Sequence, residues 1–282
     1  MARRRLERGG DGATAAAVRE PSRHYRRGRK TAEADPRFNM ALARGLEILR
    51  AFRPEDACLG NADLAERTGI PKATITRLTF TLGELGYLTY LPAYGKYALA
   101  AGVLSLGFAV LAQTEANVRA HPAMEALAQD FGGTVGLAMR DGTEAVILDI
   151  ARGQATWTRN TSVGSRIPLV STCVGWSLLH AADPAERREA FAALEAAHPQ
   201  DWPRIRKRIE TAFGELDRRG FCVGIGEYHA LANSTGVPYR EPASGKVMAF
   251  YCSGLASALS RQDLEEVWGP RLLALAQSLR GG

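Results

Sequence analysis

Residues 62–78 read ADLAERTGIPKATITRL, and this stretch predicts two short helices joined by a tight turn. Asn61 is a favourable helix N-cap, and Gly69 is of the residue type that most often follows the end of a helix. Pro71 suits the first position of the second helix, which is expected to continue to about Leu85. Two short helices in this close succession indicate a helix-turn-helix, the motif whose second helix enters the major groove of DNA.

The second predicted helix has two chemically different faces when its residues are placed at 100° intervals. One face is apolar and is expected to pack inward; it carries Ile75, Leu78, Leu82 and Leu85. The opposite face holds small, hydroxylated and basic side chains and one phenylalanine, namely Lys72, Ala73, Thr76, Arg77 and Phe80. No acidic residue occurs from Thr68 to Leu82. This face suits a DNA groove, and the alternative is a structural three-helix bundle with a solvated charged face.

The neighbouring segments extend this motif to a winged helix-turn-helix. A first helix is expected to run to Phe52, with Asp35 as its N-cap and Pro36 in its first position, because apolar residues recur there at helical spacing (Phe38, Leu42, Leu46, Leu49). Residues 87–90 and 96–99 predict two short strands around a turn at 92–95, with Lys96 making the tip of the hairpin basic. Two strands in this position form a wing.

A long apolar segment separates this region from the rest of the chain. Residues 101–118 predict one alanine-rich helix with almost no charge. On a monomer it would expose a large apolar surface, so we expect it to pack against a second subunit. A second domain is then expected to begin after His121–Pro122 with a helix at Ala123. It is expected to contain a hairpin that turns at Asp141–Gly142 and to close with a helix capped by Ser260 and Asp263. Its strands and helices lack a regular βαβ alternation, which predicts an α+β domain with an antiparallel sheet flanked by helices.

The charge of the chain is concentrated at its N-terminus. The formal net charge is +6, yet residues 1–37 contain eleven basic and five acidic residues, and the remainder contains 25 of each. The basic balance is therefore no evidence about the folded part. We expect a disordered basic arm over residues 1–36 that adds non-specific attraction to phosphate, unless translation begins nearer Met40. The other expected segments are a winged helix-turn-helix (37–100), a linker helix (101–120) and a second domain (121–282).

Composition argues against several other classes of protein. No apolar run reaches the roughly 18–20 residues that cross a bilayer, and the N-terminus lacks the apolar stretch of a secretory signal. We therefore expect a cytoplasmic protein with no membrane partner. The four cysteines contain no C-x-x-C pair and are expected to be reduced thiols: Cys58, Cys173, Cys222 and Cys252. No metal, cofactor or catalytic residue is expected.

Several blocks of the sequence resemble the IclR-type (isocitrate lyase regulator) family of bacterial transcription regulators, over about residues 38–280. Residues 62–78 are similar to that family's L-A-x-x-x-G-L-P-K-S-T-V-x-R-L block, which is the most specific match. Residues 43–49 resemble the R-x-L-x-I-L motif of its first helix. Residues 85–88 and 95–99 resemble its wing motifs G-Y-L and Y-x-L, and residues 121–127 resemble the start of its sensor domain.

The resemblance implies a winged helix-turn-helix, a linker helix and a GAF-like effector domain, assembled as dimers or dimers of dimers. It implies a repressor or activator whose partners are a double-stranded DNA operator and a small organic acid, often aromatic. The family's DNA-reading positions correspond to Lys72, Ala73, Thr74, Thr76 and Arg77. Arg44 on the first helix is expected to contact phosphate, and Lys96 the DNA backbone. Thr76 and Arg77 project most directly outward, so they are the expected base contacts.

The sensor region departs from the family's pattern. The family loop L-x-H-A-T-A-x-G-K reads LVSTCVGW at residues 169–176, which places Ser171 at the histidine and Trp176 at the basic residue. An acidic position often near the ligand in relatives falls at about Gly224, and the C-I-A-A-P-V run reads NSTGVP at residues 233–238. The expected effector contacts, for which core packing is the alternative, are Trp157, Cys173, Val174, Ser234, Tyr251 and Ser253.

Two other functions compete with effector sensing. The departures in the loop allow a DNA-binding protein whose sensor domain has lost its ligand. A remoter possibility is a thiol enzyme in which Cys173, before a helix, is the nucleophile and His180 its base. These two residues are seven positions apart, about 10 Å along a helix axis, which is beyond hydrogen-bond reach.

Overall fold

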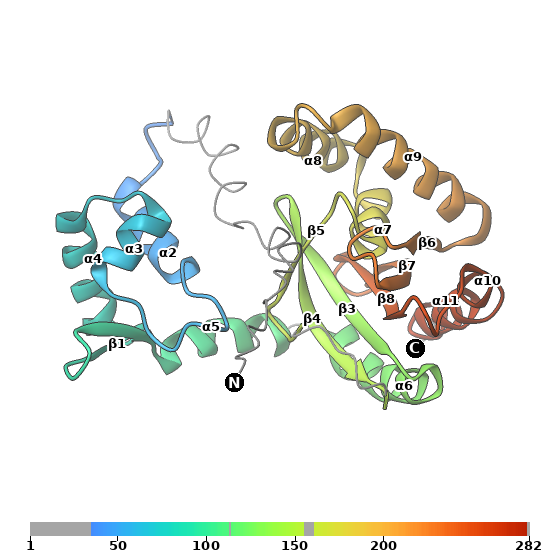
Figure 1. Ribbon diagram of the computed structural model, residues 1–282, viewed down its shortest axis with the longest axis horizontal. Helices are drawn as coiled ribbons and strands as arrows, with labels where there is room; N and C mark the ends of the chain where they lie inside the picture. Colours follow the sequence, from blue (N-terminus) through green and yellow to red (C-terminus); the bar gives the residue numbers. More distant parts are fainter. Residues whose placement is uncertain (1–34, 113, 155–160, 281–282) are drawn as a thin grey trace, which may run out of the picture.

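The computed structural model describes residues 35–112, 114–154 and 161–280, which form two domains joined through helix α5 (Figure 1). The expected basic arm falls almost wholly on residues 1–34, and Trp157 falls on residues 155–160, so both lie outside the described residues. The predicted α+β class is confirmed. The N-terminal domain is helical with a two-stranded hairpin, and the C-terminal domain contains a six-stranded antiparallel sheet.

The N-terminal domain is a three-helix unit followed by a hairpin. Its elements are α2 (Met40–Arg50), α3 (Asn61–Thr68), α4 (Lys72–Glu84), β1 (Leu88–Leu91) and β2 (Lys96–Leu99). Gly69 ends α3 with a φ of 68°, a left-handed conformation that favours glycine, and Pro71 immediately precedes α4. The domain closes around buried aliphatic side chains from all three helices and β1, including Ile48, Leu64, Ile75, Leu82 and Leu88.

Helix α2 begins four residues later than the sequence predicted. Asn39 caps it, because its side-chain oxygen accepts the Leu42 N–H at 3.1 Å. The Asp35 carboxylate, which was expected to cap the helix, instead accepts hydrogen bonds from Arg37. A cap acts where its oxygen reaches a free N–H of the first turn, and only Asn39 meets that condition here.

The exposed leucines of this domain also differ from the prediction. Leu42 and Leu46 on α2 are 64% and 46% exposed, and the buried residues of that helix are Gly45 and Ile48. Leu85 is 63% exposed, because α4 ends at Glu84 and Leu85 no longer follows the buried face. Only one side of α2 faces the core of this small domain, so the apolar residues on its other side remain exposed.

The wing is present, but its tip is not basic. β1 and β2 pair antiparallel from Leu88 with Leu99 to Leu91 with Lys96, and the turn between them reads Pro92-Ala-Tyr-Gly95. Lys96 is the first residue of β2, and its ammonium nitrogen lies 3.4 Å from an Asp63 carboxylate oxygen. The expectation of a basic tip was therefore wrong, because Lys96 reaches back toward α3.

The helix expected over residues 101–118 is divided into two helices. α5 (Ala101–Ala112) contains no buried residue, whereas α6 (Glu115–Phe131) packs into the C-terminal domain. Thr114 precedes α6 in an extended conformation. The helix expected from Ala123 thus begins eight residues earlier and runs through Pro122. That proline removes one N–H from the helical ladder, and the Val118 carbonyl it would have joined belongs to an exposed residue that water can reach.

A distant acidic side chain fixes the start of α6. Glu241 is 3% exposed, and one of its carboxylate oxygens accepts the Ala116 N–H at 3.1 Å. The other oxygen accepts the Ser244 hydroxyl. A carboxylate at the first turn of a helix compensates the positive end of the helix dipole. The contact ties α6 to the loop between β7 and β8 of the C-terminal domain.

The C-terminal domain is built on one sheet with strand order β5-β4-β3-β8-β7-β6. All neighbouring strands are antiparallel. The strands are β3 (Thr134–Asp141), β4 (Glu144–Arg152), β5 (Arg166–Pro168), β6 (Cys222–Ile225), β7 (Ala232–Arg240) and β8 (Val247–Leu255). The hairpin predicted at Asp141–Gly142 is confirmed, and Gly142 has a φ of 64° in its turn.

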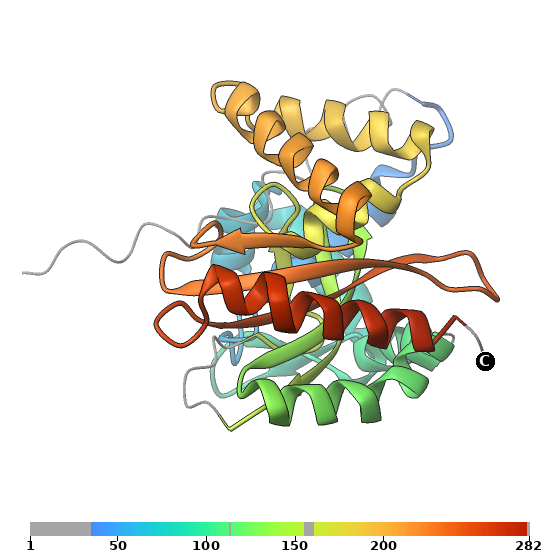
Figure 2. The ribbon, with the colours of Figure 1, turned by 90° about the vertical axis from the view of Figure 1, so that its right-hand side faces the viewer.

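Helices cover both faces of this sheet. α6 packs on one face beside the C-terminal helices α10 (Arg261–Asp263), η1 (Leu264–Trp268) and α11 (Gly269–Ser278), and Figure 2 shows α6 and α11 side by side. The predicted capping box is confirmed, because Ser260 and Asp263 exchange hydrogen bonds. The other face carries α7 (Cys173–Ala181), α8 (Pro184–Ala197) and α9 (Trp202–Arg219). Within the described residues, no helix is long and apolar enough to span a membrane.

Candidate nucleic-acid interface and ligand cavity

Helix α4 presents a solvent-exposed face made of the side chains that the sequence singled out. Lys72, Ala73, Thr76 and Arg77 are exposed, and Thr74 is half-buried at the edge of that face. Ile75, Thr79 and Leu82 anchor the opposite side in the core. Thr79 was not expected there; its hydroxyl donates to the Ile75 carbonyl at 3.0 Å, which satisfies a buried polar group. The rigid core thus holds the exposed face in one orientation.

The two basic side chains of this face have no charged partner. In the part of the chain that the structure describes, neither Lys72 nor Arg77 forms an ion pair, so both cations face solvent. Thr76 is different, because its hydroxyl donates to the Lys72 carbonyl at 3.0 Å and accepts from the Asn61 amide at 3.1 Å. Its polar group therefore links α3 to α4. Lys72 and Arg77 remain as the long hydrogen-bond donors of this face, and the planar guanidinium of Arg77 suits a base edge.

The remaining two predicted DNA contacts lie on other elements. Arg44 is half-buried on α2. Lys96 is paired with Asp63, and both side chains are 42% exposed. An exposed pair of this kind leaves part of the lysine's charge available, while the neighbouring carboxylate reduces its attraction for phosphate.

The C-terminal domain contains a cavity of about 90 Å³ between its sheet and the start of α7. Five of the six residues predicted to contact an effector line it together: Cys173, Val174, Ser234, Tyr251 and Ser253. Trp157 lies outside the described residues. The structure adds residues that the sequence did not single out, namely Thr134, Ile147, Thr161, Ile167, Thr172, Tyr228, His229 and Ala232.

The N-terminus of α7 opens onto this cavity. Thr172 caps the helix, accepting the Gly175 N–H at 3.1 Å and donating to the Pro168 carbonyl at 2.7 Å. Cys173 and Val174 are the first two helical residues, and their N–H groups have no acceptor within the helix. Such a terminus attracts anions, because free N–H groups and the positive end of the helix dipole coincide.

A row of hydroxyl groups crosses the sheet beneath the same cavity. Thr134 on β3 pairs with Ser253 on β8, and Ser253 pairs with Ser234 on β7. Residues directly opposite each other in antiparallel strands point to the same face, so the three hydroxyls lie side by side.

Two of the lining residues that the sequence analysis did not single out could have been predicted. The alternation of side chains along β3 places Thr134 on this face, and Thr172 occupies the N-cap position of α7. His229 lies in a loop, where the sequence carried no such signal.

Close packing around α7 explains why the family's acidic position is a glycine here. A Cβ on Gly224, the neighbour of Ser234 on β6, would lie 2.9 Å from the Cys173 sulfur. An acidic side chain at position 224 would collide with the Cys173 sulfur, so Cys173 is compatible with glycine at that position and not with an acidic residue. Similarly, a Cβ on Gly175 would lie 2.4 Å from the Cα atom and the carbonyl oxygen of Leu169. Helix α7 therefore lies directly against the chain that follows β5.

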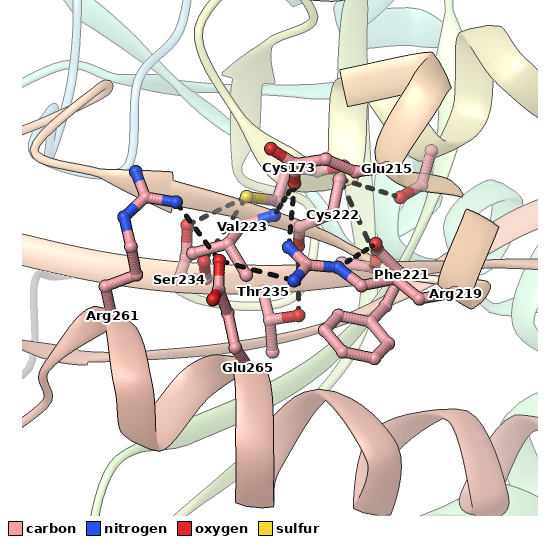
Figure 3. A network of polar contacts seen from close by, with 12 residues as sticks. Cys173, Glu215, Arg219, Phe221, Cys222, Val223, Ser234, Thr235, Arg261 and Glu265 are labelled. Carbon is pink, nitrogen blue, oxygen red and sulfur yellow. Dashed lines mark hydrogen bonds and ion pairs between the residues drawn. The ribbon is translucent and has the colours of Figure 1, made fainter. Parts of the chain in front are cut away.

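Cys173 is a buried thiol within a polar network (Figure 3). Its Sγ accepts the Ser234 hydroxyl at 3.4 Å and donates to the Ser234 carbonyl at 3.4 Å. Burial raises the pKa of the Cys173 thiol well above its ordinary value, which disfavours a reactive thiolate. His180 is bonded to Asp217, with 2.8 Å between Nε2 and Oδ1. The pairing required of a thiol enzyme is therefore not formed.

Trp176, which stands in place of a basic residue, packs in the interior. It is fully buried, and its indole N–H donates to the Val170 carbonyl at 3.1 Å. The Arg208 guanidinium stacks over the indole ring at 3.9 Å, and it also pairs with Glu227. Among the described residues, no three His, Cys, Asp or Glu side chains are grouped to hold a metal ion.

Comparison with known proteins agrees with this geometry. Residues 41–92 match the IclR helix-turn-helix domain, and residues 108–280 match the bacterial transcriptional regulator IclR C-terminal domain. The chain is 34% identical over 242 residues to the HTH-type transcriptional regulator TsaQ1/TsaQ2 of Comamonas testosteroni, which covers 85% of this chain and 87% of that protein. It is 32% identical over 252 residues to the Pca regulon regulatory protein of Pseudomonas putida, covering 87% and 84%.

Solved structures show the same architecture. An IclR family transcriptional regulator from Brucella abortus superposes with a TM-score of 0.78 at 38% identity, covering 87% of this chain and 92% of that one. An IclR homologue from Microbacterium hydrocarbonoxydans, complexed with 4-hydroxybenzoate, has a TM-score of 0.67 and 20% identity, covering 86% and 100%. The second likeness shows a shared fold.

Proposed function

Because this chain belongs to the IclR family of bacterial transcriptional regulators, we propose that α4 reads the bases of an operator and that the cavity beside α7 binds the metabolite that changes operator affinity. The proposed base contacts are Arg77 and the small side chains Ala73 and Thr76. Lys72, Thr74, Arg44 and Lys96 are proposed to contact the sugar-phosphate backbone. The proposed effector contacts are Cys173, Val174, Ser234, Tyr251 and Ser253.

The exposed face of α4 carries the DNA-reading part of this proposal. It combines two cations that lack ion-pair partners among the described residues with side chains small enough to let the helix approach base edges. Footprinting the intergenic regions around the protein's own gene tests it. We expect protection of a palindromic site, and protection without sequence preference would contradict base reading by α4. The position of that site relative to the promoter would distinguish repression from activation.

We further propose that two subunits associate through α5. This helix has four strongly exposed apolar side chains and no buried residue; they are Leu104 (74%), Leu106 (54%), Phe108 (67%) and Val110 (45%). Covering such a surface with a second copy removes it from water, and a two-fold dimer matches a palindromic operator. A dimer of dimers would need a further contact in the C-terminal domain.

The double variant Leu104→Ser/Phe108→Ser is expected to shift the protein from dimer to monomer at micromolar concentration. Its affinity for a palindromic operator should fall about 100-fold, because the second half-site no longer binds at high effective concentration. Sedimentation velocity and fluorescence anisotropy measure the two effects. Val267→Ser, at a 43% exposed site on η1, is the matched control and should leave the α5 dimer intact. A double variant that stays dimeric would refute the assignment.

We propose a small organic acid as the effector. The N-terminus of α7 and the hydroxyls of Ser234, Ser253 and Thr134 suit a carboxylate and its polar substituents. Ile147, Ile167 and the Tyr251 ring offer apolar surface for a short aliphatic or aromatic skeleton. A relative of the same fold binds 4-hydroxybenzoate, which makes aromatic acids reasonable first probes.

Ser253→Ala is expected to weaken binding of the effector about three- to tenfold, because it removes one hydrogen bond to the ligand. Benzoate, 4-hydroxybenzoate, pyruvate and succinate can be screened by thermal shift, with glucose as a neutral comparison. Ser278→Ala on α11, whose hydroxyl donates to Leu275 at 2.8 Å, is the matched control and should bind like the parent. No shift with any member of a broad acid library would favour a sensor domain that has lost its ligand.

We propose that the protein has no catalytic activity and acts in the cytoplasm, where its DNA is. The buried Cys173 thiol and the His180–Asp217 pair support the first statement. The second follows from the role of a transcriptional regulator.

A further inference from the structure

Phe80 is the largest apolar side chain on the exposed face of α4, and it is 66% exposed. At 100° per residue it lies about 80° around the helix from Lys72, between Thr76 at about 40° and Ala73 at about 100°. Arg77 lies at about 140°, so Phe80 falls within the angular range of the proposed reading face, about 4.5 Å along the axis beyond Arg77. An exposed phenylalanine at this position contributes little hydrophobic stabilisation to the free protein, because most of its ring stays in water.

The charges around Phe80 restrict what can cover it. Lys72 and Arg77 precede it on the same face, and neither has an ion-pair partner among the described residues. A second copy docking face to face would bring these cations against their equivalents, which is unfavourable. A polyanion that binds both cations lies along this face, and the next turn of the face carries Phe80. Glu84, at about 120° and one turn further on, marks the end of the face that suits DNA.

We infer that Phe80 is a specificity-determining residue that contacts the C5-methyl group of a thymine in the operator. A phenyl ring neither donates nor accepts a conventional hydrogen bond, so it gains nothing from the polar edges of guanine, adenine or cytosine. The thymine methyl is the one apolar group that the bases display in the major groove. The inference rests on the proposed role of α4 and adds a base preference to it.

Replacing thymine by deoxyuridine tests this contact, because it removes only the methyl group. An operator selected in vitro with the full-length protein is resynthesised with each thymine replaced in turn, at symmetric positions of both half-sites. Dissociation constants are measured by fluorescence anisotropy for the parent and for Phe80→Ala. At one position we expect the parent to lose about fourfold per half-site, the equivalent of one buried methyl group. Phe80→Ala should bind the thymine and uracil operators equally there.

Two further variants separate this contact from general effects. Phe80→Leu keeps an apolar side chain and should retain part of the thymine preference. Leu85→Ala is the matched control, because Leu85 is also an exposed apolar side chain (63%) but lies just after the end of α4, outside the proposed reading face. It should retain the full loss at uracil. Thermal denaturation and sedimentation velocity confirm that each variant is folded and has the parent's oligomeric state.

The outcomes distinguish this inference from the function on which it rests. If Phe80→Ala loses as much affinity at every uracil position as the parent does, the methyl contact is refuted while reading by α4 stands. If Phe80→Ala keeps its uracil losses but dissociates into monomers, Phe80 belongs to a subunit interface. If the selection with the parent yields no sequence preference, the proposed function itself fails.

Discussion

Arg77→Ala is expected to remove most of the protein's ability to distinguish its operator from a scrambled duplex. Arg77 is the long donor on the reading face whose guanidinium has no ion-pair partner in the described chain, and a bidentate contact to guanine contributes about 1–3 kcal/mol of discrimination. The ratio of specific to non-specific affinity should therefore fall by about 5- to 150-fold per half-site. Binding to the scrambled duplex should change far less. Titrations of both duplexes at one salt concentration measure the ratio.

Lys96→Ala is the control for this result, because it also removes one positive charge. Its ammonium lies 3.4 Å from Asp63, so it should weaken binding to all sequences evenly and modestly. The slope of log affinity against log salt should decrease by less than the value of about one that an unpaired phosphate contact gives. If Arg77→Ala instead kept the parent's preference, α4 would be wrongly assigned as the reading helix.

Gly175→Ala is expected to destabilise the C-terminal domain by about 3 kcal/mol or more. The added Cβ would lie 2.4 Å from the backbone of Leu169, and relieving that contact requires α7 to move away from the chain after β5. For a domain of this size, the loss corresponds to roughly 6–12 °C in melting temperature. Trp157, Trp176, Trp202 and Trp268 are all the tryptophans of the chain, so their fluorescence follows this domain alone.

Gly214→Ala is the matched control, because it makes the same substitution in another helix. Nothing lies within 4 Å of a Cβ at Gly214 on α9, so the change should be neutral or stabilise the domain by about 0.5–1 kcal/mol. Opposite signs for the two variants would show that the packing of α7 limits position 175. Equal melting temperatures for Gly175→Ala and the parent would show that α7 has more room than its backbone contacts indicate.

Local signals were enough to predict much of the fold. Gly69 and Pro71 determine where α3 ends and α4 begins, and both act through backbone geometry that neighbouring residues alone establish. The capping box at Ser260 and the turn at Gly142 are of the same kind. The outward face of α4 also follows from helical periodicity, because the helix is regular from Lys72 to Glu84.

The errors arose where distant parts of the chain decide the structure. The start of α6 depends on Glu241, which lies 125 residues away, so His121–Pro122 looked like the natural boundary. Lys96 seemed free until the structure placed Asp63 beside it. In the cavity, Cys173, Ser234 and Ser253 came from resemblance to a family. His229 lines the cavity from the loop between β6 and β7, and neighbouring residues alone do not determine the conformation of that loop.

The carboxylate of Glu241 has a practical meaning for exchanging sensors between relatives. Helix α5 has no fully buried residue and meets the C-terminal core only near its end, through the partly buried Leu111, whereas α6 is held from its first turn by a contact inside the C-terminal domain. A transplantable sensor module therefore starts at Thr114, not at the proline of His121–Pro122. A chimera joined at His121–Pro122 would take the first turn of α6 from one relative and the buried Glu241 that binds this turn from another. A chimera joined at Thr114 takes α6 and Glu241 from the same protein.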